Sequence, residues 1–164
     1  MSFIATAPPA ATGTSPSPDP LVIENDGWFP NIDLAHMRDA MRLDGTVTNE
    51  RLAQAVIIAV LHVNGELDTW QWQKHAAGHL TMAAVPAGTI NRESKLTIQY
   101  RRAVYSMAKA DLIERYRDID STASSLTDKK AMEWMNDAPS EQRRNAHWAV
   151  SDILGRTHAT VELI

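Results

Sequence analysis

The sequence predicts an all-α fold, a small helical bundle of about four to five helices with an extended N-terminal arm and a strand-like C-terminal tail. Two observations indicate this class. Apolar residues recur at three- and four-residue spacing in the longest segments, and the strict alternation typical of strands is nearly absent. The 164 residues suit one domain, and a chain of this length buries about two thirds of its unfolded surface.

The first twenty residues are rich in proline, serine, threonine and alanine, a composition that favours a disordered or extended arm over residues 1–20. Two interpretations stay open, a tail without a role and an arm that becomes ordered on a neighbouring subunit. The segment lacks the basic start and the unbroken apolar core of a signal peptide, so we expect no membrane partner. We therefore divide the chain into this arm, a helical domain over residues 21–155 and a tail over residues 156–164.

Two short apolar groups in the entry segment, residues 21–23 and 28–29, are too apolar to remain in solvent, and we expect them to anchor the start of the chain on the helical body. Asn31 or Asp33 is placed to cap a short helix over residues 34–43. Its buried side is predicted to hold Leu34, Met37 and Met41.

Thr48 is predicted to cap the next helix, whose middle, residues 55–63, is apolar on nearly every side. A helix that is apolar all round must be covered all round. Two interpretations fit. The segment is a central core helix, or it exposes a subunit interface whose candidate residues are Ile57, Ile58 and Leu61. Gly65 is expected to kink this helix or to end it before a second segment, residues 66–77.

The longest uninterrupted periodic run is residues 94–120, which predicts the central helix of the bundle, with Ser94 as its N-cap. Its buried face is predicted to consist of Leu96, Tyr100, Val104, Met107, Leu112 and Tyr116. The opposite face, with Gln99, Arg102, Lys109 and Glu114, is expected to stay in water.

A short helix is expected over residues 131–136 and a last helix over residues 140–154, followed by Gly155 in the left-handed conformation. The end of the chain then changes period, because apolar and polar residues alternate as in a strand that has no partner in this chain. The predicted docking tail consists of Thr157, Ala159, Thr160, Val161, Glu162, Leu163 and Ile164.

The sequence contains few patterns typical of catalytic, cofactor-binding or metal-binding sites. The chain has no cysteine, which excludes disulfides and thiolate metal sites. No phosphate-binding glycine loop or serine nucleophile motif is present. His75 and His79 have the spacing of a metal-binding pair, but no third ligand is evident, and surface or core histidines are the favoured interpretation. We therefore expect no catalytic residues, no cofactor, no metal and no enzymatic activity.

Several sequence blocks occur together in one order: W-F-P-N-I-D at 28–33, T-V-T-N-E-R-L at 46–52, Y-R-R-A-V-Y-S-M-A at 100–108 and E-R-Y-R-D-I-D at 114–120. In these blocks the chain resembles the head completion proteins of contractile-tailed temperate phages, the L-type head completion family. The resemblance extends from Val22 to the C-terminus. Its specific part is the last two blocks.

The resemblance implies a structural connector in the neck of the virion, made in the host cytoplasm. Such proteins add to the portal vertex after DNA packaging, form a dodecameric ring and join the capsid to the tail. The implied partners are further copies of the chain, the portal protein and a tail-side completion or tail terminator protein. Packaged DNA would pass through the ring without sequence-specific binding, in keeping with a net charge of −4. A ring needs two different surfaces on each subunit that bind each other. Ile57, Ile58 and Leu61 are candidate residues of one of these surfaces.

Two alternatives come from other classes of protein. The first is a DNA-binding packaging factor, in which residues 34–43 and 48–61 form a helix-turn-helix. Its second helix would present Ala55, Val56, Ile57 and Ile58 to the groove, rather than the arginine, asparagine or glutamine side chains that read bases. The second alternative is a helical metalloenzyme built on His75 and His79.

Overall fold

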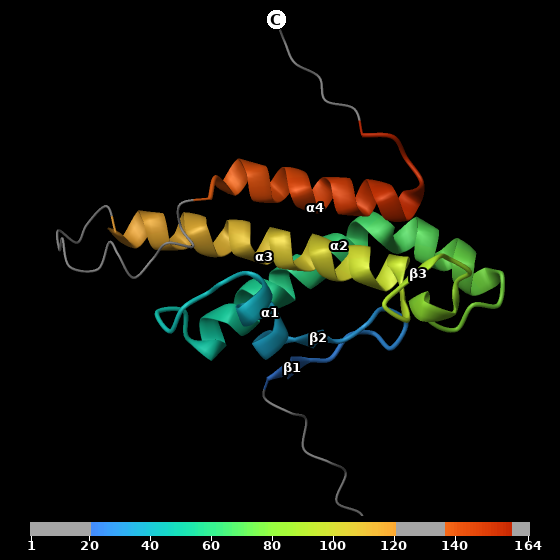
Figure 1. The fold of residues 1–164 in the computed structure, drawn as a ribbon, viewed down its shortest axis with the longest axis horizontal. Coiled ribbons are helices and arrows are strands. Elements are labelled where there is room, and N and C mark those ends of the chain that lie inside the picture. The colour runs from blue at the N-terminus through green and yellow to red at the C-terminus, as the bar shows by residue number, and fades with distance from the viewer. Residues whose placement is uncertain (1–20, 121–136, 159–164) are drawn as a thin grey trace, which may run out of the picture.

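Three long helices packed side by side form the body of the computed structural model, which describes residues 21–120 and 137–158 (Figure 1). In chain order its elements are β1 (Val22–Ile23), β2 (Ile32–Asp33), α1 (Leu34–Ala40), α2 (Asn49–Ala76), the 3₁₀ helix η1 (Met82–Ala84), β3 (Thr89–Ile90), β4 (Glu93–Ser94), α3 (Lys95–Asp120) and α4 (Pro139–Leu154). α3 packs against both α2 and α4. The prediction of a small, mostly helical domain is confirmed.

Two small antiparallel sheets accompany the helices, and the sequence did not predict them. β1 pairs with β2, with Ile23 opposite Ile32, and β3 pairs with β4 in a hairpin, with Thr89 opposite Ser94. Each strand has two residues. A pair of residues is too short to show the period of two by which strands are identified in a sequence.

The entry segment is anchored on the helices, as predicted. Trp28 and Phe29 are buried. The ring of Phe29 stacks on Tyr100 of α3 at a centroid distance of 4.9 Å, and the ring of Trp28 meets Trp70 of α2 edge-on at 5.6 Å. The indole nitrogen of Trp28 also donates to the carbonyl of His79 at 2.9 Å. This segment therefore ties α2, α3 and the loop after α2 together.

α1 is shorter than predicted. Asp33 is its N-cap, and the carboxylate accepts hydrogen bonds from the backbone N–H groups of Ala35 and His36. The helix ends at Ala40 rather than at residue 43, because Arg42 takes a left-handed conformation, with φ 54°, that stops the helix. The predicted burial of Leu34 and Met37 is confirmed. Met41 is only partly buried.

α2 runs unbroken for 28 residues and passes through Gly65, so the predicted end of the helix at this glycine is wrong. Thr48 caps the helix as predicted, and its hydroxyl accepts from the backbone N–H of Arg51. A glycine inside a helix costs about 1 kcal/mol relative to alanine. Burial of Val63 and Leu67 on either side of Gly65 provides more than that.

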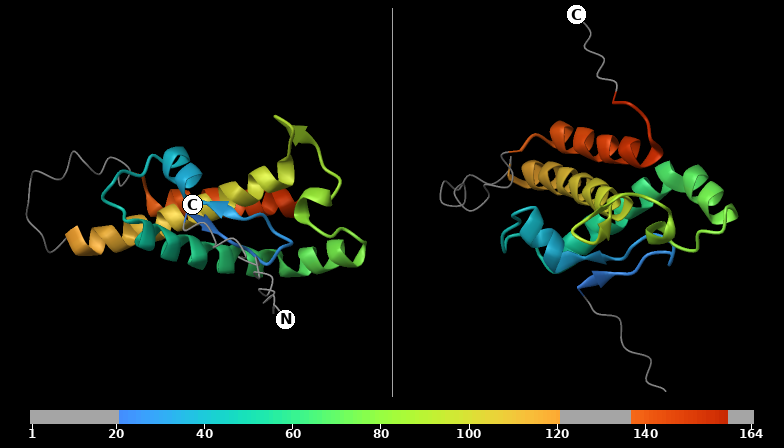
Figure 2. Two further views of the ribbon diagram at one scale, coloured as in Figure 1. Left: turned by 90° about the horizontal axis from the view of Figure 1, so that it is seen from below. Right: turned by 45° about the vertical axis from the view of Figure 1, so that its right-hand side comes forward.

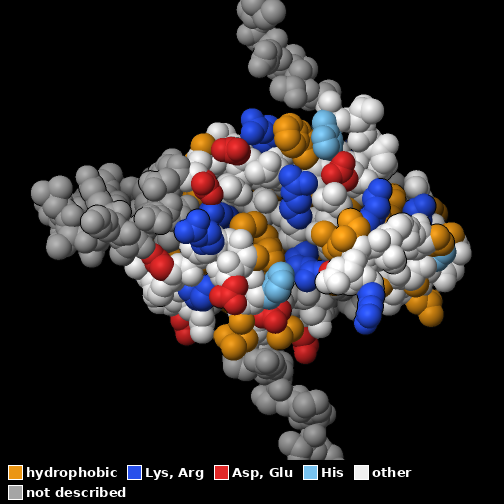
Figure 3. Space-filling view, viewed as in Figure 1, with side chains coloured by type: hydrophobic (Ala, Val, Ile, Leu, Met, Phe, Trp, Pro, Cys, Tyr) orange, Lys and Arg blue, Asp and Glu red, His pale blue; other side chains and the backbone are white. Residues whose placement is uncertain are grey.

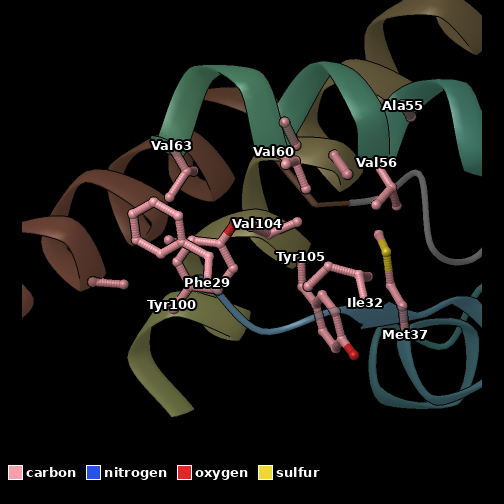
Figure 4. Close-up of a cluster of buried hydrophobic side chains, with 14 of the residues drawn as sticks. Phe29, Ile32, Met37, Ala55, Val56, Val60, Val63, Tyr100, Val104 and Tyr105 are labelled. Atoms are coloured by element: carbon pink, nitrogen blue, oxygen red, sulfur yellow. The ribbon is translucent and has the colours of Figure 1, made fainter. Parts of the chain in front are cut away.

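The hydrophobic core lies where α2, α3 and the entry segment meet. Figure 4 shows Val63 of α2 directed toward the rings of Phe29 and Tyr100, and Val56 of the same helix directed toward Met37 of α1. On α3, four of the predicted core residues are buried and two are partly buried. The buried ones are Leu96, Tyr100, Val104 and Leu112, and the partly buried ones are Met107 and Tyr116.

Lys109 does not stay in water, which corrects the prediction for the opposite face of α3. Its side chain is 8% exposed, and Nζ lies 2.7 Å from a carboxylate oxygen of Asp137 and 3.3 Å from the carbonyl oxygen of Met41. Asp137 lies just before α4, and α4 covers this side of α3. A helix enclosed on two sides buries positions that a single-face pattern assigns to solvent.

α4 begins at Pro139 and ends at Leu154, close to the predicted range, and Gly155 has the predicted left-handed conformation with φ 67°. Proline is favoured in the first turn because it has no N–H to leave unpaired. The helix predicted over residues 131–136 lies outside the described residues. None of the described helices has both the length and the apolar character that a membrane span requires.

Candidate assembly surface

The outer face of α2 carries the three residues that the sequence singled out as a subunit interface. Ile57 is 38% exposed, Ile58 is 42% exposed and Leu61 is 69% exposed. The opposite face of the same helix is buried against α3 and the entry segment. The core-helix interpretation of residues 55–63 therefore describes one side of the helix, and the other side is an exposed apolar surface, for which the subunit interface remains a prediction.

A groove lies between α2 and α4, with α3 at its base, and it adjoins this exposed surface. Its volume is about 390 Å³. The apolar part of its lining comes from Ala55, Ile58, Ala59 and Met107, and the polar part from His62, Asp111, Arg143 and His147. A groove with an apolar base and a charged rim is suited to a side chain of another protein segment.

Two histidines meet at one carboxylate on the rim of this groove. His62 Nε2 lies 3.0 Å from Oε1 of Glu66, one turn later on α2, and His147 Nδ1 on α4 lies 3.5 Å from the same oxygen. The two imidazole rings meet edge-on at 6.4 Å. This cluster links α2 to α4 across the groove.

A second link holds α4 to α3. Arg143 forms a double hydrogen bond with the carboxylate of Glu114, and this hydrogen bonding raises the pKa of the arginine further above its ordinary value. The guanidinium group of Arg143 is therefore part of the contact between these helices. Bidentate arginine–carboxylate pairs fix geometry as well as charge, so α4 is held in one register on α3.

The first residues of the predicted docking tail are fixed on α4. After Gly155 the imidazole ring of His158 stacks on Trp148 at 5.1 Å, and its Nε2 lies 2.9 Å from Oδ1 of Asp152. The guanidinium group of Arg144 also lies over the ring of Trp148, with its Cζ atom 5.1 Å from the ring centroid. Thr157 is exposed. The other tail residues named above, 159–164, lie outside the described residues.

A buried polar network joins the entry segment to α2 and α3. The hydroxyl of Tyr100 donates to the side-chain oxygen of Asn64 at 2.6 Å and accepts from the amide of Asn25 at 2.8 Å. Burial raises the pKa of Tyr100 well above its ordinary value. Tyr105 is also buried, which raises its pKa to about 12, and its hydroxyl lies 2.8 Å from Nδ1 of His36. Both tyrosines are therefore neutral hydrogen-bonding groups at physiological pH.

The structure separates the two residues of the metal-binding alternative. His75 lies in the last turn of α2, whereas His79 follows the end of that helix and Gly78, so the i, i+4 relation of a continuous helix is lost. Within residues 21–120 and 137–158, no group of three or more histidine or acidic side chains is arranged to hold a metal ion.

The helix-turn-helix alternative is not favoured by the burial of its second helix. Of the four residues that would face the groove of the DNA, Ala55 and Val56 are buried, and the exposed Ile57 and Ile58 are apolar side chains that make no hydrogen bonds to bases. Figure 3 shows acidic and basic side chains interspersed over the face of the molecule viewed in Figure 1. Extended single-sign basic surfaces, which dominate DNA affinity, are not seen on this face.

Sequence reasoning missed a second set of exposed apolar side chains, at the end of the molecule that holds the C-terminus of α2 and the β3–β4 hairpin (Figures 1 and 2). Trp72 is 71% exposed, Leu80 is 75% exposed and Ile90 is 64% exposed. The exposure of Trp72 could have been predicted from the sequence. It lies eleven residues after Leu61, and three turns of helix bring it to the same face of α2.

Comparisons with known proteins identify one family. Residues 23–164 match the family described as "Phage head completion protein (GPL)". The chain is also similar to the "Head completion/stabilization protein" of Escherichia phage P2, with 40% identity over 162 residues that cover 96% of this chain and 94% of the relative. No solved structure matches the chain.

Proposed function

The chain belongs to the phage head completion protein family, and from this premise we propose that it is a neck connector. In this proposal it binds the portal vertex after DNA packaging, forms a dodecameric ring there and joins the capsid to the tail. The coarser role, a structural protein that completes the phage head, follows from the family itself. The finer role depends on two surfaces of the subunit, the exposed face of α2 and the C-terminal tail.

The observation that carries the proposal is the exposed apolar face of α2. Ile57, Ile58 and Leu61 lie on the outside of a helix whose inner face is already well packed. A contiguous apolar surface of this kind marks a site of protein–protein contact. A cyclic assembly requires that two different surfaces of each subunit meet, and this face supplies one of them.

The tail supplies the contact with the portal protein. His158 is held on α4 by Trp148 and Asp152, so the tail starts from a fixed point beside the last helix. Beyond it the sequence alternates, with Val161 and Leu163 on one side, as in a strand that adds to the edge of another protein. Main-chain hydrogen bonds then provide affinity, and pockets for the apolar side chains provide specificity.

DNA and the tail-side protein are the other neighbours in this proposal. DNA passes through the ring without sequence-specific binding, because a net charge of −4 does not favour the counterion release that holds a basic protein on a duplex. A tail-side completion or tail terminator protein then binds the opposite side of the ring.

The tail experiment uses DNA-filled heads that lack this protein. Leu163→Asp is expected to abolish binding to the heads, while Thr160→Asp, which places the same charge on the other side of the strand, is expected to bind at least partly. Binding is measured by co-sedimentation with the heads, and the helical content of both variants by circular dichroism. If Leu163→Asp protein bound and completed heads as the natural chain does, the tail would not be the docking element.

The ring contact is tested with the same heads. Leu61→Asp is expected to fold, because Leu61 is 69% exposed, but to leave heads with fewer copies than the natural chain does. Copies per head are counted by mass or by electron microscopy. A full ring of Leu61→Asp protein would contradict the assignment of this face.

A further inference from the structure

The exposed face of α2 has the residue spacing of a second helix-packing seam. Six positions follow one another in alternating steps of four and three residues, and all six are exposed in the structure. They are Gln54, Ile58, Leu61, Gly65, Asp68 and Trp72. This is the heptad spacing at which one helix packs along another. The buried seam of α2 lies on the opposite side of the helix, so the outer seam does not serve the core of this chain.

Gly65 lies in the middle of this outer seam, and nothing among residues 21–120 and 137–158 requires a glycine there. Its backbone is helical, without a positive φ, and a Cβ atom added at this position would meet no atom within 4 Å. Glycine is among the least favourable residues inside a helix. A gap in the side-chain surface between Leu61 and Trp72 is suited to a bulky side chain that approaches closely from another molecule.

We propose that in the free protein α2 pairs in antiparallel orientation with α2 of a second copy. With the two-fold axis near Leu61, Ile58 of each copy lies opposite Gly65 of the other, because both are equally far from the axis. A self-complementary contact of this kind closes as a dimer. The apolar groove beside Ile58, lined also by Ala59 and Met107, extends the surface that the dimer covers.

The charges along the seam select the antiparallel orientation. Glu50 lies near the start of α2 and Asp68 lies in its second half, both exposed on the outer side of the helix. A parallel pair would place each of these charges opposite its own copy. The antiparallel pair moves the two copies of each carboxylate apart, so that like charges do not face each other.

If the chain forms the ring of the proposed function, on which this step rests, the dimer competes with that ring. It covers Ile57, Ile58 and Leu61, which the ring would use between neighbouring subunits. Since one surface cannot hold both contacts, the dimer must separate before its subunits join a ring. The free protein is thereby kept from forming rings away from the portal.

The first test measures the dimer in solution. Sedimentation equilibrium is expected to show a dimer for the natural chain, and Gly65→Leu is expected to weaken it by about tenfold or more, because the new side chain fills the space for Ile58. Gln73→Leu is the control, since it adds the same side chain to an exposed position of α2 outside the seam. A natural chain that stays monomeric or forms larger rings would overturn the proposal, as would a Gly65→Leu protein that dimerises normally.

The second test measures orientation and uses the absence of cysteine from the chain. Leu61→Cys lies beside the two-fold axis, so two copies are expected to form a disulfide with each other on mild oxidation. Gln73→Cys lies far from its own copy in the antiparallel pair and is expected to stay unlinked. Efficient linking of Gln73→Cys, or none of Leu61→Cys, would overturn the antiparallel arrangement.

The third test connects the dimer with assembly. Oxidised, disulfide-linked Leu61→Cys protein is expected to fail to complete DNA-filled heads, and reduction is expected to restore completion. A linked dimer that completed heads as well as its reduced form would overturn the covering of the ring surface. Failure of the natural chain to bind heads would instead contradict the proposed function, while the dimer in solution would be unaffected.

Discussion

α2 and α3 are the two longest helices of the described chain, and they differ in a way that composition does not suggest. The middle of α2, residues 55–63, contains only one residue that is not apolar, His62, whereas α3 carries charged residues along most of its length. Yet α3 is the more enclosed helix, with even Lys109 buried, while α2 leaves Ile57, Ile58 and Leu61 exposed. Position in the bundle therefore determines burial, and the apolar excess of α2 has no use within the monomer.

The largest effect is expected where the two helices differ most, at one leucine on each. Leu112→Ala on α3 removes a side chain that is 1% exposed and is expected to lower the free energy of unfolding by about 2–5 kcal/mol. Leu61→Ala on α2 is expected to change the stability of the dilute protein by less than about 0.5 kcal/mol. Urea denaturation measures both. Similar losses for the two variants would show that the outer face of α2 packs within the monomer.

Next in size is the buried charge on α3. Asp137→Ala leaves the ammonium group of Lys109 buried without its carboxylate, and the expected loss is about 1–3 kcal/mol. The control is Asp68→Ala on the exposed face of α2, for which little change is expected in dilute protein. The double variant Asp137→Ala with Lys109→Met is expected to recover part of the loss. An Asp137→Ala protein as stable as the natural chain would mean that solvent reaches Lys109.

Alkaline pH is expected to lower the stability of the protein through a buried tyrosine of α3. Burial raises the pKa of Tyr105 from its ordinary value of 10.0 to about 12, so the folded state retains the phenolic proton that the unfolded chain loses first. The stabilisation is complete below pH 10 and is lost as the pH rises from about 10 to 12, with an effect of roughly 1–2 kcal/mol. Unfolding experiments across this range should show a smaller fall for Tyr105→Phe than for the natural chain. An equal fall would assign the effect to other groups.

The smallest effect concerns the glycine on the outer face of α2. Gly65→Ala is expected to raise the stability of dilute, monomeric protein by about 0.5–1 kcal/mol, because alanine is the better helix former and the space for its methyl group is open. Thermal unfolding at low protein concentration measures it. A destabilised variant would indicate that the space above Gly65 is filled within the chain.

The sequence predicted most of the fold where local chemistry decides it. The caps at Asp33 and Thr48, the left-handed Gly155 and four of the buried positions of α3 needed only side-chain type and helical spacing. The candidate surface was predicted in part, because the apolar excess of α2 identified Ile57, Ile58 and Leu61 as too many for one core. The tail prediction for residues 159–164 remains a prediction, since the structure does not describe them.

What the sequence by itself determined is therefore the helical class, most helix ends and the surplus of apolar residues on α2. Only the tertiary structure decided that α2 continues through Gly65, that Lys109 is buried beside Asp137, and that α2 and α4 border a groove. The physical reason is that caps and periodicity act within a few residues along the chain. Burial depends instead on which elements pack together, and those elements are far apart in the sequence.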